Sequence, residues 1–278
     1  MPELPEVETV KRVLSNKVKG KKIISAKVYW NNIIAFPEVK TFEKQIKNQT
    51  IKNVDRYGKW LMFELSDYYL LSHLRMEGKY FIKSSKDPKE KHQHVIFNLS
   101  GGTDLRYHDT RKFGKMYLLD KEDIYNVKPL SSLGLEPWDK RLTPKYLKDK
   151  MKNKPIKTCL LDQSIITGIG NIYADEILFS SHINPNILGS QLTQTDYKNI
   201  IKSTQDILSK AIENGGTTVK SYTSEEGVHG RFQTHLKVHT KEKCPKCKGV
   251  ITKTNIGGRG TYYCANCQKE RVVWKRQK

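Results

Sequence analysis

Long apolar segments are missing from this sequence of 278 residues. No run approaches the roughly 20 consecutive apolar residues that a membrane-spanning helix requires. The N-terminus also lacks the basic stretch followed by an apolar stretch that marks a signal peptide. These absences predict a protein with no membrane partner, located in the cytoplasm.

Cysteine is scarce as well, with five residues. Four of them form two Cys-x-x-Cys pairs, and the fifth, Cys159, stands alone in an apolar run. A secreted disulfide framework is therefore not expected. Cys159 is interpreted as a small core residue.

Acidic residues are outnumbered, because 50 Lys and Arg stand against 29 Asp and Glu and give a formal net charge of +21. The 14 tyrosines are scattered through the same basic segments. This composition suits a polyanionic partner, with nucleic acid as the leading candidate. A lysine-rich solvated surface is the alternative, since net charge alone defines neither a fold nor a site.

The length is at the upper end for one domain and favours two. After a first helix that ends near Gly20, the first half reads as short strands separated by polar turns, a pattern typical of a β-sandwich. The predicted strands span residues 22–30, 50–57, 59–65, 68–73, 94–99, 103–108 and 115–119. Residues 84–91, rich in Lys, Asp and Pro, are predicted to form a flexible surface loop.

The second half has a different periodicity. Proline and glycine interrupt any regular pattern between residues 126 and 143, where we place a domain linker. Beyond it the apolar spacing becomes helical, and helices are predicted at residues 144–151, 156–163, 173–181 and 194–213. The predicted fold class is therefore α+β.

The first residues carry the most distinctive candidate chemistry. Removal of Met1 would make Pro2 the N-terminus, a secondary amine that titrates near neutrality and that a helix dipole pushes lower. Its condensation with a sugar aldehyde carbon gives an iminium without an N–H, which acts as an electron sink for eliminations along the sugar. Glu3 and Glu6 lie one helical turn apart beside it, so one can act as an acid and the other as an orienter. Alternatively, Glu3, Glu6 and Glu8 only complement the dipole of an amphipathic helix.

Two further groups in the first half are candidates. Lys59 follows Gly58 at the start of a predicted strand, where a turn would aim an ammonium into a cleft. A solvated lysine at a strand end is the alternative. His92 and His94 alternate along a strand and share a face, which suits phosphate contact better than metal binding because a third ligand is lacking.

Met76, Arg111 and Phe113 lie in turns flanked by strands. An apolar wedge, an aromatic wedge and a guanidinium on loop tips would suit insertion into a base stack, where they fill the space of an extruded nucleotide. The alternative is that Met76 and Phe113 turn inward to the core.

Residues 167–176 form a glycine-containing turn before a predicted helix, with Asn171 as the predicted N-cap. Free backbone N–H groups at such a turn make an anion site, and a DNA phosphate is the simplest anion. Lys152, Lys154 and Lys157 lie upstream and are expected to reach the same backbone. A plain turn between helices is the alternative. Residues 215–232 are predicted to be either a loop that orders on binding a ligand or a passive linker.

The C-terminal motif is the most specific pattern. Two Cys-x-x-Cys pairs, separated by sixteen residues, predict one structural Zn2+ bound by Cys244, Cys247, Cys264 and Cys267. Between the pairs, residues 250–254 and 261–263 are predicted to form a hairpin with Arg259 in its tip at 255–260, a shape suited to a narrow groove. A purely structural zinc with a solvated arginine is the alternative.

Taken together, the N-terminal segment at 2–9, the Met76 and Arg111/Phe113 loops, the turn at 168–171 and the finger resemble bacterial formamidopyrimidine-DNA glycosylases over nearly the whole chain. The resemblance implies a bifunctional enzyme of base excision repair. It would excise oxidised purines such as 8-oxoguanine and formamidopyrimidines, and cut the abasic site by β- and δ-elimination. Damaged double-stranded DNA, a monomeric state and association with the nucleoid are implied as well.

The resemblance also assigns roles to residues. Pro2 would be the Schiff-base nucleophile and Glu3 the acid that assists sugar-ring opening. Lys59 would donate a proton or contact a phosphate in β-elimination, and Arg259 would serve δ-elimination. Met76, Arg111 and Phe113 would fill the void, and the DNA contacts would be His92, Arg111, Lys152, Lys157 and Asn171.

The same resemblance divides the chain into an N-terminal catalytic β-sandwich domain and a C-terminal helix-two-turns-helix DNA-binding domain with a lesion-covering loop and a zinc finger. The predicted boundaries are 1–125, 126–143 for the linker, 144–234, 235–269 for the finger and 270–278 for a basic tail of unknown role. Two alternatives stay open: an endonuclease VIII-like enzyme for oxidised pyrimidines, and a non-catalytic zinc-ribbon DNA-binding protein. Leu4 and the Arg111/Phe113 pair favour the purine enzyme.

Overall fold

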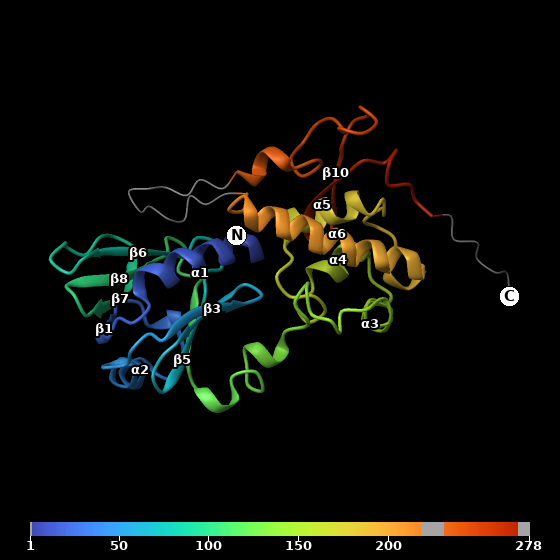
Figure 1. Cartoon of the computed structure of the whole chain (residues 1–278). Helices are drawn as coiled ribbons and strands as arrows, with labels where there is room; N and C mark the ends of the chain where they lie inside the picture. The colour runs from blue at the N-terminus through green and yellow to red at the C-terminus, as the bar shows by residue number, and fades with distance from the viewer. Residues whose placement is uncertain (1, 218–230, 272–278) are drawn as a thin grey trace. The chain divides into compact units, whose positions relative to one another are not determined.

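The computed structural model describes residues 2–217 and 231–271, which fall into two compact units (Figure 1). The first unit comprises Met1–Ser132 with Ile212–Phe232, and the second comprises Leu133–Ala211 with Gln233–Lys278. Both helices and sheets are present, and the predicted α+β class is confirmed.

The first unit begins with helix α1 (Leu4–Val18), whose apolar residues recur with helical spacing and are buried. Pro5 lies in the first turn, where its missing N–H costs no hydrogen bond. The buried stripe joins the core between two sheets, and the helix packs against strand β3 (Asn53–Tyr57). The sequence prediction of a first helix followed by a sandwich is therefore confirmed.

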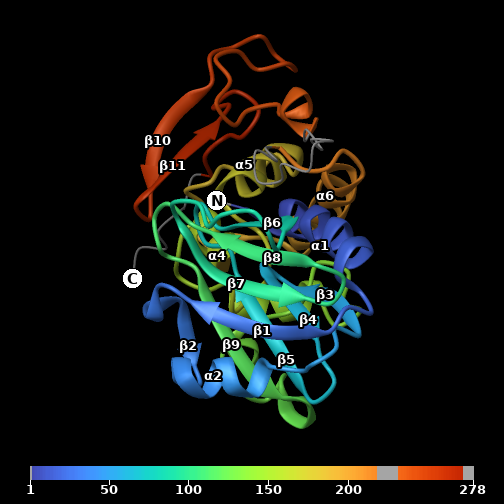
Figure 2. The same ribbon diagram turned by 90° about the vertical axis from the view of Figure 1, so that its left-hand side faces the viewer.

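The two sheets stack face to face (Figure 2). One has the order β1-β7-β8-β6 and is antiparallel throughout. Its strands are β1 (Ile23–Val28), β6 (Lys79–Ser84), β7 (Gln93–Leu99) and β8 (Thr103–His108). The other has the order β2-β9-β5-β4-β3, with β2 and β9 parallel. Its remaining strands are β2 (Ile34–Phe36), β4 (Trp60–Glu64), β5 (Tyr68–His73) and β9 (Lys115–Asp120).

Three elements of this unit were not expected from the sequence: β2, β6 and helix α2 (Val39–Ile46). Helix α2 has only eight residues, and its apolar signal rests on Phe42 and Ile46, which are buried one turn apart. Strand β2 has only three residues and pairs with β9 through a register irregularity. Elements this short give too few repeats for a period to be recognised.

The segment at 84–91 is exposed at the surface, as predicted, and a buried arginine binds its backbone. Arg106 is buried beneath it and donates hydrogen bonds to the backbone carbonyl groups of Ser84, Asp87 and Pro88 at 3.1, 2.7 and 2.9 Å. Asp104 balances the guanidinium charge at 2.9 Å. The loop is therefore fixed from below by one arginine, which provides several donors in a rigid plane.

The second unit contains helices α3 (Pro144–Lys150), α4 (Ile156–Leu161), α5 (Asn171–Ser180) and most of α6 (Gln194–Glu213), close to their predicted positions. Thr143 caps α3 by accepting a hydrogen bond from the N–H of Tyr146 at 3.2 Å. The hairpin of β10 (Thr252–Ile256) and β11 (Arg259–Tyr263) belongs to the same unit. Cys159 is buried, as predicted.

The described residues also contain short 3-10 helices: η1 (Asn31–Ile33), η2 (Lys121–Asp123), η3 (Leu130–Ser132), η4 (Gly189–Gln191) and η5 (Phe232–His235). Among the residues that the structure describes, no helix has both the length and the apolar character that crossing a membrane requires.

Candidate active site and DNA-binding elements

The start of α1 positions the candidate nucleophile. Pro2 directly precedes Glu3, the N-cap residue, and is partly exposed, whereas Glu3 is only 2% exposed. The N–H of Glu3 donates to Oε2 of Glu6 at 2.9 Å, which ties the first helical turn together. Pro2 therefore lies at the positive end of a helix, beside a buried carboxylate. Met1 lies outside the described residues.

Glu6 also contacts residues that follow α6. Its Oε1 atom accepts hydrogen bonds from the N–H of Thr217 at 2.8 Å and from the hydroxyl of Thr217 at 3.1 Å. The simple alternative, in which Glu6 only complements a helix dipole, is therefore wrong. Most of the predicted loop at 215–232 lies outside the described residues, so its behaviour on binding stays a prediction.

Lys59 lies in the two-residue turn between β3 and β4, where Tyr57 pairs with Trp60. Gly58 supplies the positive φ of 55° that this turn requires. Lys59 is only 6% exposed, so the alternative of a solvated lysine is wrong. Its role in elimination stays a prediction.

Glu8 holds this hairpin against α1 and was missed as a specific contact from the sequence. Its Oε2 atom accepts a hydrogen bond from Nε of Arg56 at 2.9 Å, and its Oε1 atom accepts one from Nε of Arg12 at the same distance. Burial by itself would raise the pKa of Glu8, but the charges and hydrogen bonds of Arg12, Arg56 and Lys11 outweigh burial and lower it. A pair across the fold gives no signal in a local sequence window.

His73 is a second buried group near Lys59 that sequence reasoning missed. Burial, followed by the charges of Arg75 and Lys59, lowers the pKa of His73 to about 3. Its Nδ1 atom accepts a hydrogen bond from the N–H of Arg75 at 3.0 Å, consistent with a neutral ring. The imidazole thereby fixes the loop that carries Met76.

The three predicted wedge residues lie on loop tips. Met76 is 36% exposed, Phe113 is 49% exposed, and the guanidinium of Arg111 lies 4.7 Å from the centre of the Phe113 ring. The alternative, that Met76 and Phe113 turn into the core, is therefore wrong. Asp109, which is buried, holds the second loop by accepting from the N–H groups of Arg111, Phe113 and Gly114 at 3.0, 2.9 and 2.8 Å.

The histidine arrangement differs from the prediction. His92 does not lie in the strand; it precedes β7 with a φ of 67°, although its ring still lies 6.3 Å from that of His94. The ring of His108, which was not predicted as a site residue, lies 5.7 Å from that of His92. Burial is the main reason that the pKa values of His94 and His108 are lowered. A phosphate contact by His92 stays a prediction.

In the second unit, Asn171 is the first residue of α5 and the N-cap is Gly170, one residue earlier than predicted. The prediction of a capping side chain was wrong because Nδ2 of Asn171 instead donates to the carbonyl group of Gly260 at 2.8 Å. Gly168 makes the preceding turn with a φ of 99°. Asn171 therefore links the N-terminus of α5 to the finger hairpin.

Lys157 requires a correction. It does reach the predicted turn, donating to the carbonyl group of Asn171 at 3.2 Å, but its side chain is 0% exposed. Its ammonium pairs with Asp175, which is also hydrogen-bonded to Nδ1 of His239 at 2.7 Å. A buried, neutralised ammonium is not a direct phosphate contact. Lys152 and Lys154 are exposed and remain candidates for that role.

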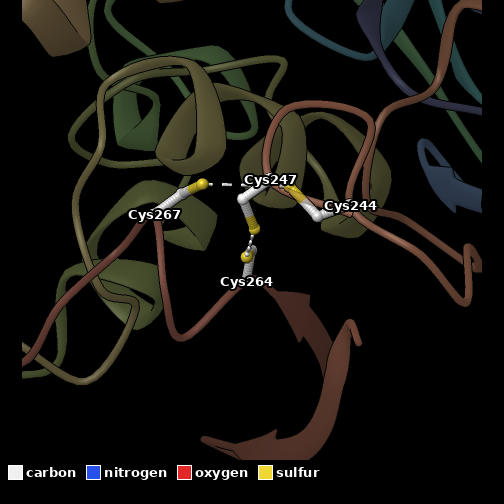
Figure 3. Close-up of side chains that lie close together, drawn as sticks. All are labelled: Cys244, Cys247, Cys264 and Cys267. Carbon is white, nitrogen blue, oxygen red and sulfur yellow. Dashed lines mark hydrogen bonds between the residues drawn. The ribbon is translucent and has the colours of Figure 1, made fainter. Parts of the chain in front are cut away.

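The four predicted cysteine ligands come together in the finger (Figure 3). Their sulfur atoms all lie within 4.8 Å of one another, with 3.8 Å between Cys244 and Cys267 and 3.5 Å between Cys247 and Cys264. A tetrahedral zinc with Zn–S bonds of about 2.3 Å places its sulfurs about 3.8 Å apart. The donor set therefore fits one structural zinc.

The finger hairpin has a tighter tip than predicted. Its turn is Gly257–Gly258, with φ angles of 59° and 75°, and Ile256 pairs directly with Arg259. Arg259 is therefore the first residue of β11, and it is exposed.

Two polar residues that sequence reasoning missed join the finger to the rest of the second unit. Gln268 is fully buried; its amide accepts from the N–H of Cys264 and donates to the carbonyl group of Ile183, both at 2.9 Å. Glu176 accepts from the N–H groups of Lys237, Val238 and His239 at 2.9, 3.0 and 2.9 Å. An amide and a carboxylate give no sign in the sequence of which distant backbone they bind.

The predicted basic tail begins within the described residues and continues beyond them. Arg271 pairs with Asp196 at 2.7 Å and donates to the carbonyl group of Gln191 at 3.1 Å. Burial alone would raise the pKa of Asp196, but hydrogen bonds from Arg271 and Thr193 lower it. Residues 272–278 lie outside the described residues.

These elements define a class of protein with a candidate nucleophile before its first helix and a four-cysteine finger suited to one zinc. Family models agree with it. Residues 1–116 match the formamidopyrimidine-DNA glycosylase N-terminal domain, residues 133–223 match the H2TH domain of that enzyme, and residues 241–269 match a zinc finger found in FPG and IleRS.

Relatives that match the whole chain agree with the family models. The formamidopyrimidine-DNA glycosylase of Bacillus subtilis is 45% identical over 98% of this chain and 100% of its own length. That of Exiguobacterium sibiricum is 46% identical over 97% of this chain and 99% of its own. A Lactococcus lactis Fpg structure in complex with DNA that contains an abasic site has a TM-score of 0.90 at 36% identity, covering 96% of this chain and 100% of that one. This chain belongs to the formamidopyrimidine-DNA glycosylase family, and it is a DNA glycosylase of base excision repair.

Proposed function

We propose that this enzyme excises oxidised purines, 8-oxoguanine and formamidopyrimidines, and then cuts the abasic site by β,δ-elimination through a Schiff base on Pro2. The observation that carries the proposal is the start of α1, where Pro2 precedes a helix and adjoins the buried carboxylate of Glu3. A Lactococcus lactis relative with a TM-score of 0.90 was solved with DNA containing Fapy-dG, which supports the same substrate class here.

In the proposed reaction, the unprotonated Pro2 nitrogen attacks C1′ of the damaged nucleotide, the base departs with the electrons of the glycosidic bond, and the proton lost by the Pro2 nitrogen goes to the departing base. Glu3 donates the proton that opens the sugar ring, leaving a cationic iminium. Loss of the C2′ proton to water then breaks the C3′–O3′ bond and expels the 3′-phosphate. Loss of the C4′ proton to water breaks the C5′–O5′ bond and expels the 5′-phosphate. Water releases Pro2 by hydrolysis of the iminium.

Other residues would position the DNA. Lys59, on the turn that Glu8 and Arg56 hold against α1, would donate a proton or contact a phosphate during β-elimination, and Arg259 would serve δ-elimination. Met76, Arg111 and Phe113 would fill the gap left by the everted nucleotide. His92, Lys152 and Asn171 would contact the DNA backbone. Zinc, when bound by the four cysteines, supplies folding free energy to the finger.

We also propose that one copy of the chain acts on each lesion, within the cytoplasm and on the nucleoid, since a single chain contains the nucleophile, the wedge residues and the finger. The proposed domain boundaries remain residues 1–125, 144–234 and 235–269, with a linker at 126–143 and a tail at 270–278. Light scattering of the enzyme with a duplex that contains one lesion should give a mass for one protein per duplex.

The test separates base excision from strand cutting. A form that retains Met1 has no Pro2 amine, and it should lose borohydride trapping on abasic-site DNA. Glu3→Gln should lose release of 8-oxoguanine but keep much of its cleavage of a ready-made abasic site, whose aldehyde already exists in part. Both should still bind lesion DNA, because the wedge loops and finger are unchanged.

Undiminished trapping with Met1 retained would identify a lysine as the nucleophile, and Lys59 would be the first lysine to test. A duplex panel that includes oxidised pyrimidines tests the substrate class, and preferential release of pyrimidines would favour the endonuclease VIII-like alternative.

A further inference from the structure

Glu6 joins the N-terminal segment to residues that lie more than two hundred positions further along the chain. Its side chain is buried, and its two carboxylate oxygens face different segments. Oε2 accepts from the N–H of Glu3 at 2.9 Å, and Oε1 accepts from the N–H and the hydroxyl of Thr217 at 2.8 and 3.1 Å. Both oxygens act as acceptors toward protein donors, which is a positioning role rather than that of a proton donor to substrate.

Thr217, which Glu6 contacts after α6, belongs to a closed neck, which we define as residues 214–217 with 231–232. The N–H of Arg231 donates to the carbonyl group of Asn214 at 2.9 Å, and the N–H of Phe232 donates to that of Gly216 at 3.0 Å. These bonds bring the two sides of the neck together, and Thr217 attaches one side to Glu6. The carboxylate therefore connects the neck with the peptide that follows Pro2.

Gly216 is a residue of the neck that lies close against the Glu6 carboxylate. A Cβ atom on this residue would lie 2.5 Å from Oε1 of Glu6, and its φ of +79° is one that side-chain-bearing residues rarely adopt. The backbone of the neck lies directly on the carboxylate, and there is no room for a methyl group. Any substitution at Gly216 must displace Glu6, the neck or both.

We propose that Glu6 is a positioning residue: the neck fixes its carboxylate, and the carboxylate fixes the Glu3 backbone so that the Pro2 amine is aimed at its target carbon. This inference rests on the proposed role of Pro2 as the nucleophile. It predicts that damage to the neck slows covalent chemistry at the N-terminus without altering any group that reacts.

The experiment uses Gly216→Ala in the full-length enzyme, because this variant neither adds nor removes an ionisable group. The single-turnover rate of borohydride trapping on abasic-site DNA should fall by about 10- to 100-fold, since small misplacements of reacting groups have effects of that size. The Kd for the same DNA should stay within about twofold. The pH midpoints of the trapping rate should not move, because Glu6 transfers no proton.

Gly20→Ala is the matched control. Gly20 has nearly the same φ, +81°, but nothing lies within 4 Å of the position that a Cβ atom would take there. Both variants carry the same kind of backbone strain, whereas only one of them contacts Glu6. Gly20→Ala should trap at the wild-type rate. If the trapping rate fell equally in both variants, backbone strain alone would explain the effect, and the proposal would be overturned.

Thr217→Val is a milder second probe that removes only the hydroxyl bond and keeps the N–H bond to Glu6. It should lower the trapping rate about two- to fivefold, and Thr217→Ser should restore it. Wild-type rates in both Gly216→Ala and Thr217→Val would overturn the inference. Absence of trapping in the wild-type enzyme would instead overturn the proposed role of Pro2, so the two failures are distinguishable.

Glu6→Gln tests the role of the carboxylate itself. Both carboxylate oxygens accept hydrogen bonds, whereas the amide of Gln has one NH2 group, which would face either the N–H of Glu3 or that of Thr217. Its trapping rate should fall with unchanged pH midpoints. Loss of one limb of the pH profile in this variant would assign proton transfer to Glu6 and overturn the positioning role.

Discussion

Helices α1 and α5 both carry buried acidic side chains, but these acids contact different kinds of partner. On α5, Asp175 pairs with Lys157 and His239, and Glu176 accepts three backbone N–H groups from residues 237–239. On α1, Glu6 contacts Glu3 and Thr217, while Glu8 contacts Arg56 of the adjacent strand. The acids of α5 thus attach the segment that leads into the finger, whereas those of α1 attach that helix to Thr217 and to strand β3.

The difference shows that burial and partners, rather than residue type, define the role of an acid. On α1 only Glu6 lies in the first turn, where a helix dipole favours an acid in any protein, and α5 has no acid in its first turn. In the second unit the acids stabilise an attachment, and the metal stabilises the finger itself. In the first unit a large apolar core stabilises the fold, and the acids set local geometry.

Removal of the metal should have the largest effect of the changes considered, and this effect should fall on the second unit and not on the first. Cys264→Ser loses one of four thiolates, and a small finger depends on zinc for its folding free energy, about 10–16 kcal/mol in isolated finger peptides. We expect the zinc content to fall below one equivalent and the affinity for duplex DNA to fall at least tenfold, while the β-sheet signal of the first unit is retained. Zinc analysis, DNA titration and circular dichroism measure the three quantities.

Cys159→Ser is the matched control, because this thiol is buried but lies outside the four-cysteine cluster. It should retain one zinc and bind DNA normally. Wild-type affinity in a zinc-free Cys264→Ser protein would show that the finger needs neither its metal nor its fold for binding.

A smaller effect is expected when the buried pair on α5 is broken. Lys157→Met leaves Asp175 buried with His239 as its remaining partner, and breaking such a pair costs about 3–5 kcal/mol. The unfolding midpoint in urea should therefore fall clearly. The slope of log affinity against log salt should not change, because an ammonium that is already paired and buried releases no DNA counterion.

Lys154→Met provides the comparison, since Lys154 is exposed. Its stability should change by no more than about 0.5 kcal/mol, and its salt slope should flatten by up to about one unit if Lys154 contacts a phosphate. A stable Lys157→Met protein with a flattened slope would mean that the Lys157 ammonium leaves Asp175 to bind DNA.

The order of elements was largely predictable from the sequence, because long periodic segments such as α6 carry several turns of signal. The four zinc ligands were predictable for a different reason, because two Cys-x-x-Cys pairs at this spacing are typical of a zinc site. Helix α2 and strand β2 were missed because short elements contain too few repeats.

The contacts that organise the site could not be predicted. Lys157 looks like other lysines in a basic chain, and only its packing against Asp175 shows that it is buried. Arg106, which fixes the 84–91 loop, looks like any arginine in a strand of alternating residues. Long-range pairing is a property of the folded chain, and no local window contains both partners.

The smallest expected effect concerns Glu8, which is buried beside the candidate site yet serves stability. The charges of Arg12, Arg56 and Lys11 hold its pKa below the ordinary value of 4.5. A carboxylate with a lowered folded-state pKa stabilises the protein fully above that ordinary value, and this contribution is lost as the pH falls through the folded-state pKa. Glu8→Gln should therefore be less stable than wild type at pH 7, by about 1 kcal/mol.

The difference between Glu8→Gln and wild type should shrink as the pH falls below 4.5 and through the lowered folded-state pKa of Glu8, because both side chains are uncharged once Glu8 is protonated. Urea unfolding at several pH values measures it. Glu64→Gln is the control, because its pair with Lys121 at 3.1 Å has both side chains about one-third exposed, and exposed pairs contribute little. Its stability should stay within about 0.5 kcal/mol of wild type at every pH. A loss of stability in Glu8→Gln that does not vary with pH would mean that Glu8 acts through packing rather than charge. Glu8 would then differ from Asp175 of α5, which is paired with the charged side chain of Lys157.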